Sequence, residues 1–198
     1  MGMVFGRIAE EMPRHTIVQR NATYQIRRYE PSIAVMCDYS KGWGTSSDGT
    51  PFGSLARYIG VFGNPENMQP SKGKAEPIAM TAPVLIDSGA DTHTMMFLLP
   101  ASKYSSIEAA PTPSNPNVRL QTLPARLQAV RTFTGNLRPE RAREQLALLL
   151  ADIRRDGWVT KAPPGKTDGV EWQAAGYNAP FVIPFLKTNE VLVNVEEK

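Results

Sequence analysis

The sequence predicts an α+β protein made of two pseudo-symmetric β-β-α-β-β repeats that form a distorted antiparallel eight-stranded barrel flanked by two helices. Short apolar segments separated by turn residues run along the chain, which is typical of many short strands. Two helical stripes, at residues 51–62 and 138–155, each begin at a proline and occupy the same place in a repeated order of elements. A closed barrel removes exposed strand edges, which favours this arrangement.

Length and composition predict one domain over residues 1–198, with pseudo-repeats at about 20–100 and 117–196. The chain has 198 residues, of which 41% are hydrophobic, and this is enough to bury a core without disulfides. Its single cysteine, Cys37, has no partner for an internal disulfide and lies within an apolar strand pattern. We therefore interpret Cys37 as a packing residue in a protein of a reducing compartment.

The charge pattern argues against nucleic acid as a partner. There are 22 Lys and Arg residues against 19 Asp and Glu, a net charge of +3, and the basic residues are scattered singly or in pairs. No basic stripe interleaved with aromatic residues is present. The first residues have too short an apolar core for a signal peptide, and no run of 18 apolar residues occurs. We expect a cytoplasmic monomer that does not bind membranes.

The apolar run at 76–86 is interpreted as a central buried strand. Pro83 forbids a helix interior at this place, and the three apolar residues that follow it are typical of a strand. Because proline cannot donate to a ladder, Pro83 is expected at a bulge or an edge.

The segments 24–29 and 33–39 predict a hairpin that turns at Pro31. In the first segment Ile26 alternates with Arg27, the period of two that is expected for a half-buried strand with its polar residues facing solvent. The segments 118–124 and 127–133 repeat this order of strand, proline turn and strand. A helix follows, and one face of it carries Leu146, Leu149, Leu150 and Ile153.

The helix predicted at 51–62 has two distinct faces. An apolar stripe, expected to pack on the sheet, consists of Phe52, Leu55, Ile59 and Phe62. Beside it lie Gly53, Ala56 and Gly60, with Arg57 on their outer edge. An interior glycine costs a helix about 1 kcal/mol relative to alanine, so two on one face indicate close approach of a ligand, or else a short and frayed helix.

The chain resembles the SOUL/heme-binding protein family over about residues 1–196. The segments that carry the resemblance are 24–31, 57–60, 63–64, 78–84, 96–100, 176–180 and 188–191. The resemblance implies a small barrel flanked by two helices. It also implies that heme or a free porphyrin binds in an apolar groove between the first helix and the 177–187 loop. Proteins of this family are usually described as tetrapyrrole carriers or buffers and not as enzymes.

Several positions depart from the family pattern. Arg28 stands where certain relatives place a histidine proposed to ligate iron, so no fixed axial ligand is expected. Phe181 replaces a tryptophan in the late loop, Lys187 replaces the commoner arginine, and Arg57 matches a lysine said to face the propionates. We therefore expect non-covalent binding of heme, and iron-free porphyrins are also candidate ligands.

The predicted binding residues combine small residues under a macrocycle, apolar walls around it and cations at one edge. They are Phe52, Gly53, Ala56, Arg57, Gly60, Tyr177, Phe181, Ile183 and Lys187. The alternative is that these residues simply close one end of the barrel.

No catalytic residue and no metal-ligand set are predicted. The two histidines, His15 and His93, have no nearby nucleophile signature. Glu76 and Glu190 flank predicted strands, where a structural hydrogen bond is expected. The alternative to a tetrapyrrole protein is a small-molecule effector or protein-interaction module on the same fold.

Overall fold

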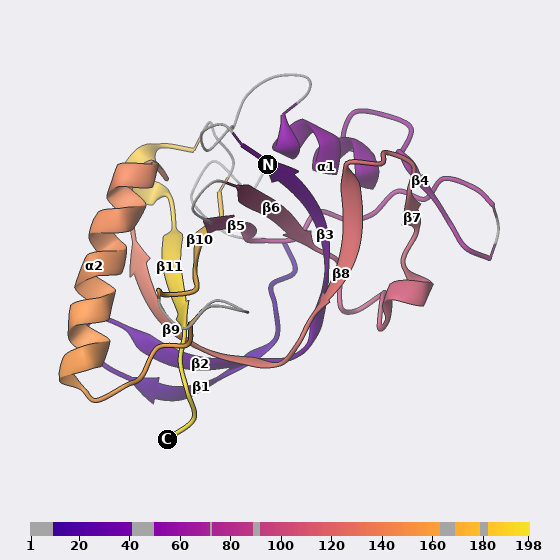
Figure 1. Ribbon diagram of the computed structural model, residues 1–198. Coiled ribbons are helices and arrows are strands. Elements are labelled where there is room, and N and C mark those ends of the chain that lie inside the picture. Colours follow the sequence, from indigo (N-terminus) through magenta and orange to yellow (C-terminus); the bar gives the residue numbers. More distant parts are fainter. Residues whose placement is uncertain (1–9, 41–49, 72, 89–91, 163–168, 179–181) are drawn as a thin grey trace. The chain divides into compact units, whose positions relative to one another are not determined.

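The computed structural model describes residues 10–40, 50–71, 73–88, 92–162, 169–178 and 182–198 (Figure 1). These residues form two compact units. Unit 1 contains 14–30 and 125–198, and unit 2 contains 10–13 and 31–124. Each unit has an antiparallel sheet and one α-helix, which confirms the α+β class.

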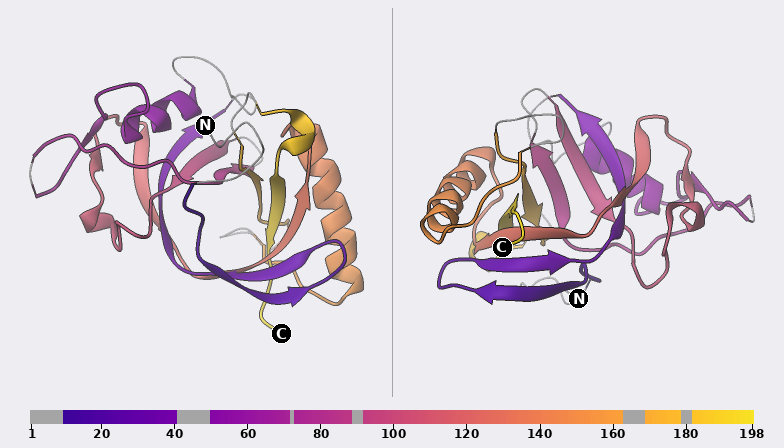
Figure 2. Two further views of the ribbon diagram at one scale, coloured as in Figure 1. Left: turned by 180° about the vertical axis from the view of Figure 1, so that it is seen from behind. Right: turned by 60° about the horizontal axis from the view of Figure 1, so that its bottom comes forward.

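Unit 1 has a five-stranded sheet in the order β1-β2-β9-β11-β10. Its strands are β1 (His15–Arg20), β2 (Gln25–Tyr29), β9 (Arg126–Phe133), β10 (Trp172–Gly176) and β11 (Asn189–Asn194). The helix α2 (Pro139–Arg155) connects β9 to β10, and the short 3-10 helix η3 (Pro184–Leu186) precedes β11. Figure 2 shows β1 and β2 as the hairpin of this unit.

Unit 2 has a four-stranded sheet in the order β5-β6-β3-β8. Its strands are β3 (Ser32–Tyr39), β5 (Val84–Ser88), β6 (His93–Leu98) and β8 (Val118–Leu123). The helix α1 (Pro51–Ile59) follows β3. A small separate ribbon pairs β4 (Asn67–Met68) with β7 (Thr112–Pro113), and η2 (Ile107–Ala109) lies just before β7.

The predicted order of elements recurs, but both predicted hairpins are wrong. Strand β2 pairs with β1 and β9, whereas β3 pairs with β6 and β8. The chain passes from one unit to the other at Pro31 and again after Pro124, so each proline turn leads into a strand of the other unit. A proline turn fixes a change of direction and not the partner of the next strand. Superposition of the repeats and closure of one barrel stay predictions.

Helix α1 begins as predicted and ends earlier. The Thr50 side chain accepts a hydrogen bond from the Gly53 amide at 3.1 Å, and Pro51 occupies the first turn. Gly60 adopts φ +90°, the left-handed conformation of a helix C-cap, so the helix stops at Ile59. Phe62 therefore lies beyond the helix, where it is 64% exposed instead of joining the apolar stripe.

The apolar run at 76–86 is a strand only at its end. Strand β5 begins at Val84, directly after a cis peptide bond between Ala82 and Pro83. Before it, Thr81 makes an isolated bridge with Glu11, and its hydroxyl donates to the Leu98 carbonyl at 2.6 Å. The prediction of a strand from residue 76 is thus wrong, because the backbone amides of Ile78 and Ala82 donate singly to Ile59 and Glu11 in place of a regular ladder.

Helix α2 covers one face of the unit 1 sheet, where it contacts β9 and β11. Leu149 and Ile153 of its predicted stripe are buried. Polar contacts hold its C-terminal half. Arg131 of β9 donates to Asp152 at 3.1 Å, and Tyr24 donates to Asp156 at 2.7 Å. No helix in the described part of the chain is long and apolar enough to span a membrane.

Candidate functional site

The opposite face of the unit 1 sheet carries a buried polar cluster. Side chains on one face of a strand recur every second residue, and directly paired residues share a face. Arg27 pairs with Gln128, and Glu190 pairs with Thr132. The cluster consists of Gln25, Arg27, Tyr29, Thr132, Tyr177 and Glu190.

An ion pair between Arg27 and Glu190 lies at its centre. The two Nη atoms of Arg27 donate to the two carboxylate oxygens at 3.2 and 2.9 Å, and the residues are 9% and 3% exposed. Glu190 also accepts from the hydroxyls of Tyr177 at 2.6 Å and Thr132 at 3.1 Å. Four donated bonds satisfy a carboxylate that would otherwise be costly to bury.

The electrostatics of the cluster keep it in one protonation state. Burial alone would lower the pKa of Arg27, but the facing Glu190 carboxylate and Tyr29 more than offset it, so the pKa is raised. Burial and the same carboxylate raise the pKa of Tyr177. Burial also raises the pKa of Tyr29. The arrangement is therefore a structural ion pair with neutral phenols around it.

Arg126 lies beside this cluster with its hydrogen bonds incomplete. Its buried Nε and Nη1 atoms have no hydrogen-bond partner among the described residues, and its guanidinium lies 5.2 Å from the centre of the Tyr29 ring. Burial lowers the pKa of Arg126, although Tyr29 and Glu171 act in the opposite direction. The contact with the Tyr29 ring partly replaces the missing bonds.

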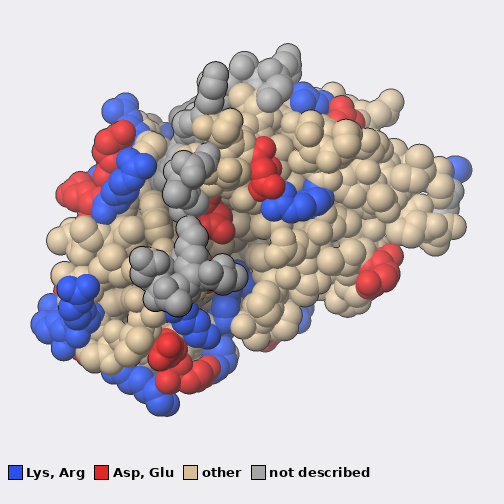
Figure 3. Space-filling model, in the orientation of Figure 1, with Lys and Arg blue, Asp and Glu red and all other residues tan. Residues whose placement is uncertain are grey.

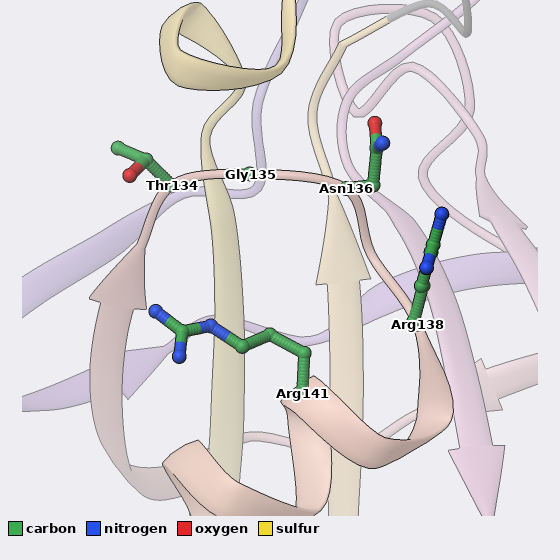
Figure 4. A pocket seen from close by; sticks show the side chains of 5 residues that line it. All are labelled: Thr134, Gly135, Asn136, Arg138 and Arg141. Carbon is green, nitrogen blue, oxygen red and sulfur yellow. The ribbon is translucent and has the colours of Figure 1, made fainter.

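A surface hollow of about 430 Å³ lies in the same unit, at the turn from β9 to α2. It is lined by Thr134, Gly135, Asn136, Arg138 and Arg141. Figure 4 shows Arg141 extending beneath the turn, while Arg138 and Asn136 lie together at its other end. Over the wider surface in Figure 3, basic and acidic side chains are interspersed.

This hollow adjoins the segment 183–187. The Gly135 amide donates to the Pro184 carbonyl at 2.9 Å, and Lys187 Nζ donates to the Asn136 side chain at 3.0 Å. Ile183 and Phe185 are 48% and 69% exposed. Apolar side chains and cations therefore meet on one surface of unit 1.

The predicted residues of α1 belong to unit 2. Gly53 and Ala56 are buried, and Ala56 has no exposed surface. Phe52 packs against Phe97 with ring centres 5.4 Å apart, and Arg57 forms an ion pair with Glu66 at 3.3 Å. Gly60 has a local role as well, because a Cβ there would lie 2.8 Å from Pro65 Cγ.

The remaining predicted residues belong to unit 1, apart from Phe181, which lies outside the described residues. Tyr177 is part of the buried cluster, whereas Ile183 and Lys187 lie beside the hollow. The sequence analysis thus identified part of the 183–187 surface. Arg138 and Arg141 were not predicted, and their only sequence signal was two arginines on either side of Pro139 at the helix start.

The sequence analysis also missed the burial of Arg27. The alternation with Ile26 predicts a half-buried strand, but Ile26 and Arg27 are both buried although they lie on opposite faces of β2, and Arg28 is the exposed residue. The expected structural role of Glu190 agrees with its four hydrogen bonds. Arg28, at the position of a possible iron ligand in relatives, forms an exposed ion pair with Glu197.

The family model described as SOUL heme-binding protein matches residues 10–194, nearly the whole chain. The chain belongs to the SOUL heme-binding protein family. A search of the curated proteins found no match.

Solved structures with little sequence identity share the fold of this SOUL protein. A hydrolase from Listeria innocua is 10% identical, with a TM-score of 0.54 and coverage of 90% of this chain and 94% of that chain. The EcmrR C-terminal domain is 11% identical, with a TM-score of 0.53 and coverage of 88% and 99%. An uncharacterized conserved protein from Listeria innocua is 10% identical, with a TM-score of 0.53 and coverage of 94% and 93%. At these identities the likeness concerns the fold alone.

Proposed function

We propose that this protein binds heme or an iron-free porphyrin without a covalent bond, and that it acts as a carrier or buffer and not as a catalyst. Membership of the SOUL family supports a tetrapyrrole ligand. The observation that carries the proposal is the surface at 183–187, where exposed Ile183 and Phe185 lie next to Lys187. A flat amphiphile with carboxylates at one edge matches that combination.

The residues present fit the macrocycle and its carboxylates. Ile183 and Phe185 offer apolar surface, and burying 100 Å² of it contributes about 2.5 kcal/mol. Pro184 restricts the backbone between them, which reduces the ordering cost of binding. Lys187 places a cation next to this surface. The predicted residues of α1 in unit 2, above all Phe52 and Arg57, are a separate proposal that is tested by its own variant.

A bound heme brings an iron centre, whereas a free porphyrin does not. The residues of the 183–187 surface would contact the macrocycle and its carboxylates, which both ligands share. His15 lies across from Tyr29, which in turn pairs with Arg126 at the start of β9. The hollow follows the end of β9, about 25 Å away at the rise of an extended strand. His93 lies in unit 2 against the Tyr39 ring. We therefore expect apolar contact to supply most of the affinity.

Titration of the purified protein with hemin and with iron-free protoporphyrin, followed by absorbance and fluorescence, tests the proposal. Both are expected to bind with one-to-one stoichiometry and with dissociation constants within about 100-fold, or 2.7 kcal/mol, of each other. Phe185→Ser is expected to weaken both by about 10-fold. Leu148→Ser, which changes an exposed apolar residue of α2, is the matched control.

Arg57→Ala tests the contribution of α1 separately, and a loss of about 2- to 5-fold that shrinks at high salt is expected. Ala56→Trp and Gly60→Leu are less informative variants, because Ala56 is enclosed and Gly60 has a left-handed backbone. Absence of saturable binding of either tetrapyrrole would refute the proposed function and favour an effector or interaction module on the same fold.

A further inference from the structure

We propose that the hollow lined by residues 134–141 is a carboxylate-binding site, through which this protein binds tetrapyrroles with free carboxylates at one edge more tightly than their esters. This inference rests on the proposed function. It adds Arg138 and Arg141 to the residues predicted from the sequence. It also names the carboxylates as the part of the ligand that these arginines recognise.

The lining of the hollow favours an anion. Arg138 and Arg141 bring two guanidinium groups, and Thr134 and Asn136 add a hydroxyl and an amide that also donate. Among the described residues that line the hollow, none is acidic. A planar guanidinium binds a carboxylate with two parallel hydrogen bonds, so this donor set suits carboxylates better than it suits neutral groups.

The two arginines differ in how far they are already engaged. Arg141 donates to Glu144, three residues further along α2, at 2.8 Å, and both side chains are about half exposed. Such an exposed pair contributes little and exchanges readily with another carboxylate. Arg138 makes no ion pair with any described residue. Its backbone carbonyl accepts the Ala142 amide, which holds the residue at the edge of the hollow.

The position of the hollow fits the edge of a flat ligand. Its turn is bonded to the 183–187 segment through the Gly135 amide and the Asn136 side chain, so the cations lie next to exposed Ile183 and Phe185. Gly135 adopts φ +104°, and apart from its chain neighbours no described residue has an atom within 4 Å of where its Cβ would be. These contacts favour an arrangement in which the macrocycle lies on the apolar segment and its carboxylates enter the hollow.

The volume also agrees with carboxylate arms. A volume of about 430 Å³ corresponds to roughly 14 water molecules at about 30 Å³ each. That is ample for two short carboxylate chains together with some of their hydration. The hollow is open to solvent, so we expect each charge contact to contribute modestly and to weaken with salt.

Fluorescence titration with protoporphyrin IX and with its dimethyl ester, both in the same dilute detergent buffer, tests the inference. Arg138→Gln and Arg141→Gln are each expected to weaken the dicarboxylate about 3- to 5-fold at low salt, and the double variant about 10-fold or more. Neither change is expected to alter affinity for the diester. Arg143→Gln is the control, because Arg143 lies on the same helix and does not line the hollow.

Each outcome decides between the two proposals. Selective loss of dicarboxylate affinity, with unchanged thermal melting, supports the carboxylate site. Parent-like affinity of the double variant for the dicarboxylate, or an equal loss for acid and diester, overturns it while leaving tetrapyrrole binding intact. If the parent protein binds neither porphyrin, the proposed function itself fails.

Discussion

The sheets of the two units share an order of strands but differ in the chemistry of the face that the helix leaves uncovered. Strands β2-β9-β11-β10 of unit 1 correspond in order to β8-β3-β6-β5 of unit 2. In unit 1 that face carries the Arg27–Glu190 ion pair and its hydroxyl donors. In unit 2 it carries buried apolar side chains, namely Ala34, Met36, Leu85, Met96 and Leu98.

The difference shows that strand order does not dictate how a face is stabilised. Apolar side chains need only to fill space, and methionines adapt readily to irregular gaps. A buried ion pair needs every donor and acceptor satisfied, so its partners must be placed by several strands at once. Unit 1 meets this demand at Glu190, while the Nε and Nη1 atoms of Arg126 have no hydrogen-bond partner among the described residues.

The largest expected effect is that of Glu190→Ala. Removing the carboxylate leaves the buried Arg27 guanidinium uncompensated, which should lower the free energy of unfolding by about 3–5 kcal/mol. Urea unfolding monitored by circular dichroism measures the loss. Glu197→Ala, which breaks the exposed pair with Arg28, should leave the urea midpoint nearly unchanged.

The double variant Arg27→Met with Glu190→Leu sharpens this prediction. Both charges are removed and apolar volume replaces them, so most of the lost stability should return. A double variant as unstable as Glu190→Ala would show that packing and not the unpaired charge causes the loss.

In unit 2 the matched variant is Met96→Ala, at a position that is 1% exposed. The cost should be about 2–4 kcal/mol, from lost burial and the cavity left behind. Met96→Leu, which keeps the volume, should cost less than about 1.5 kcal/mol. If both substitutions lower the free energy of unfolding equally, this face of the unit 2 sheet requires the shape of the Met96 side chain and not only its volume. That outcome would contradict the contrast with unit 1.

The ends of the two helices give a smaller contrast. Gly60 and Gly157 both follow a helix with positive φ, +90° and +73°. An added Cβ at Gly60 would lie 2.8 Å from Pro65 Cγ, whereas at Gly157 the nearest atom is Lys198 Nζ at 3.9 Å. Gly157→Ala should cost about 1 kcal/mol for the backbone alone, and Gly60→Ala about 2–3 kcal/mol. Equal shifts in melting temperature would contradict this reading of the clash.

The smallest expected effect is a pH dependence of unit 1 around the end of α2. Hydrogen bonds from Thr23 and Arg155 lower the pKa of Asp152, and those from Tyr24 and Arg155 lower the pKa of Asp156. A lowered pKa adds stability above the ordinary aspartate value near 4, and this stability is lost as the pH falls through the folded-state pKa. The urea concentration at which half of the protein is unfolded should therefore decrease as the pH is lowered below about 4. Asp152→Asn should flatten that fall, and an unchanged acid profile would contradict the assignment.

The sequence by itself determined the α+β class, the order of the elements and both helix starts. These are local properties, because Thr50 with Pro51 and the proline at 139 act within one turn, and apolar periodicity is set by neighbours along the chain. The family followed from short motifs in unbroken order. Of the candidate site, Ile183 and Lys187 were identified from the sequence because apolar and basic residues stand close together there.

Only the tertiary structure decided which strands pair and which polar residues are buried. A proline such as Pro31 or Pro124 interrupts a strand by its own local geometry. The partner of the next strand, however, depends on contacts that are distant in sequence. Arg27 and Glu190 are 163 residues apart, so no local pattern indicates that each satisfies the other. Likewise, the hydrogen bond from Gly135 to Pro184 joins the turn that lines the hollow to the segment 183–187, which is about 50 residues further along the chain.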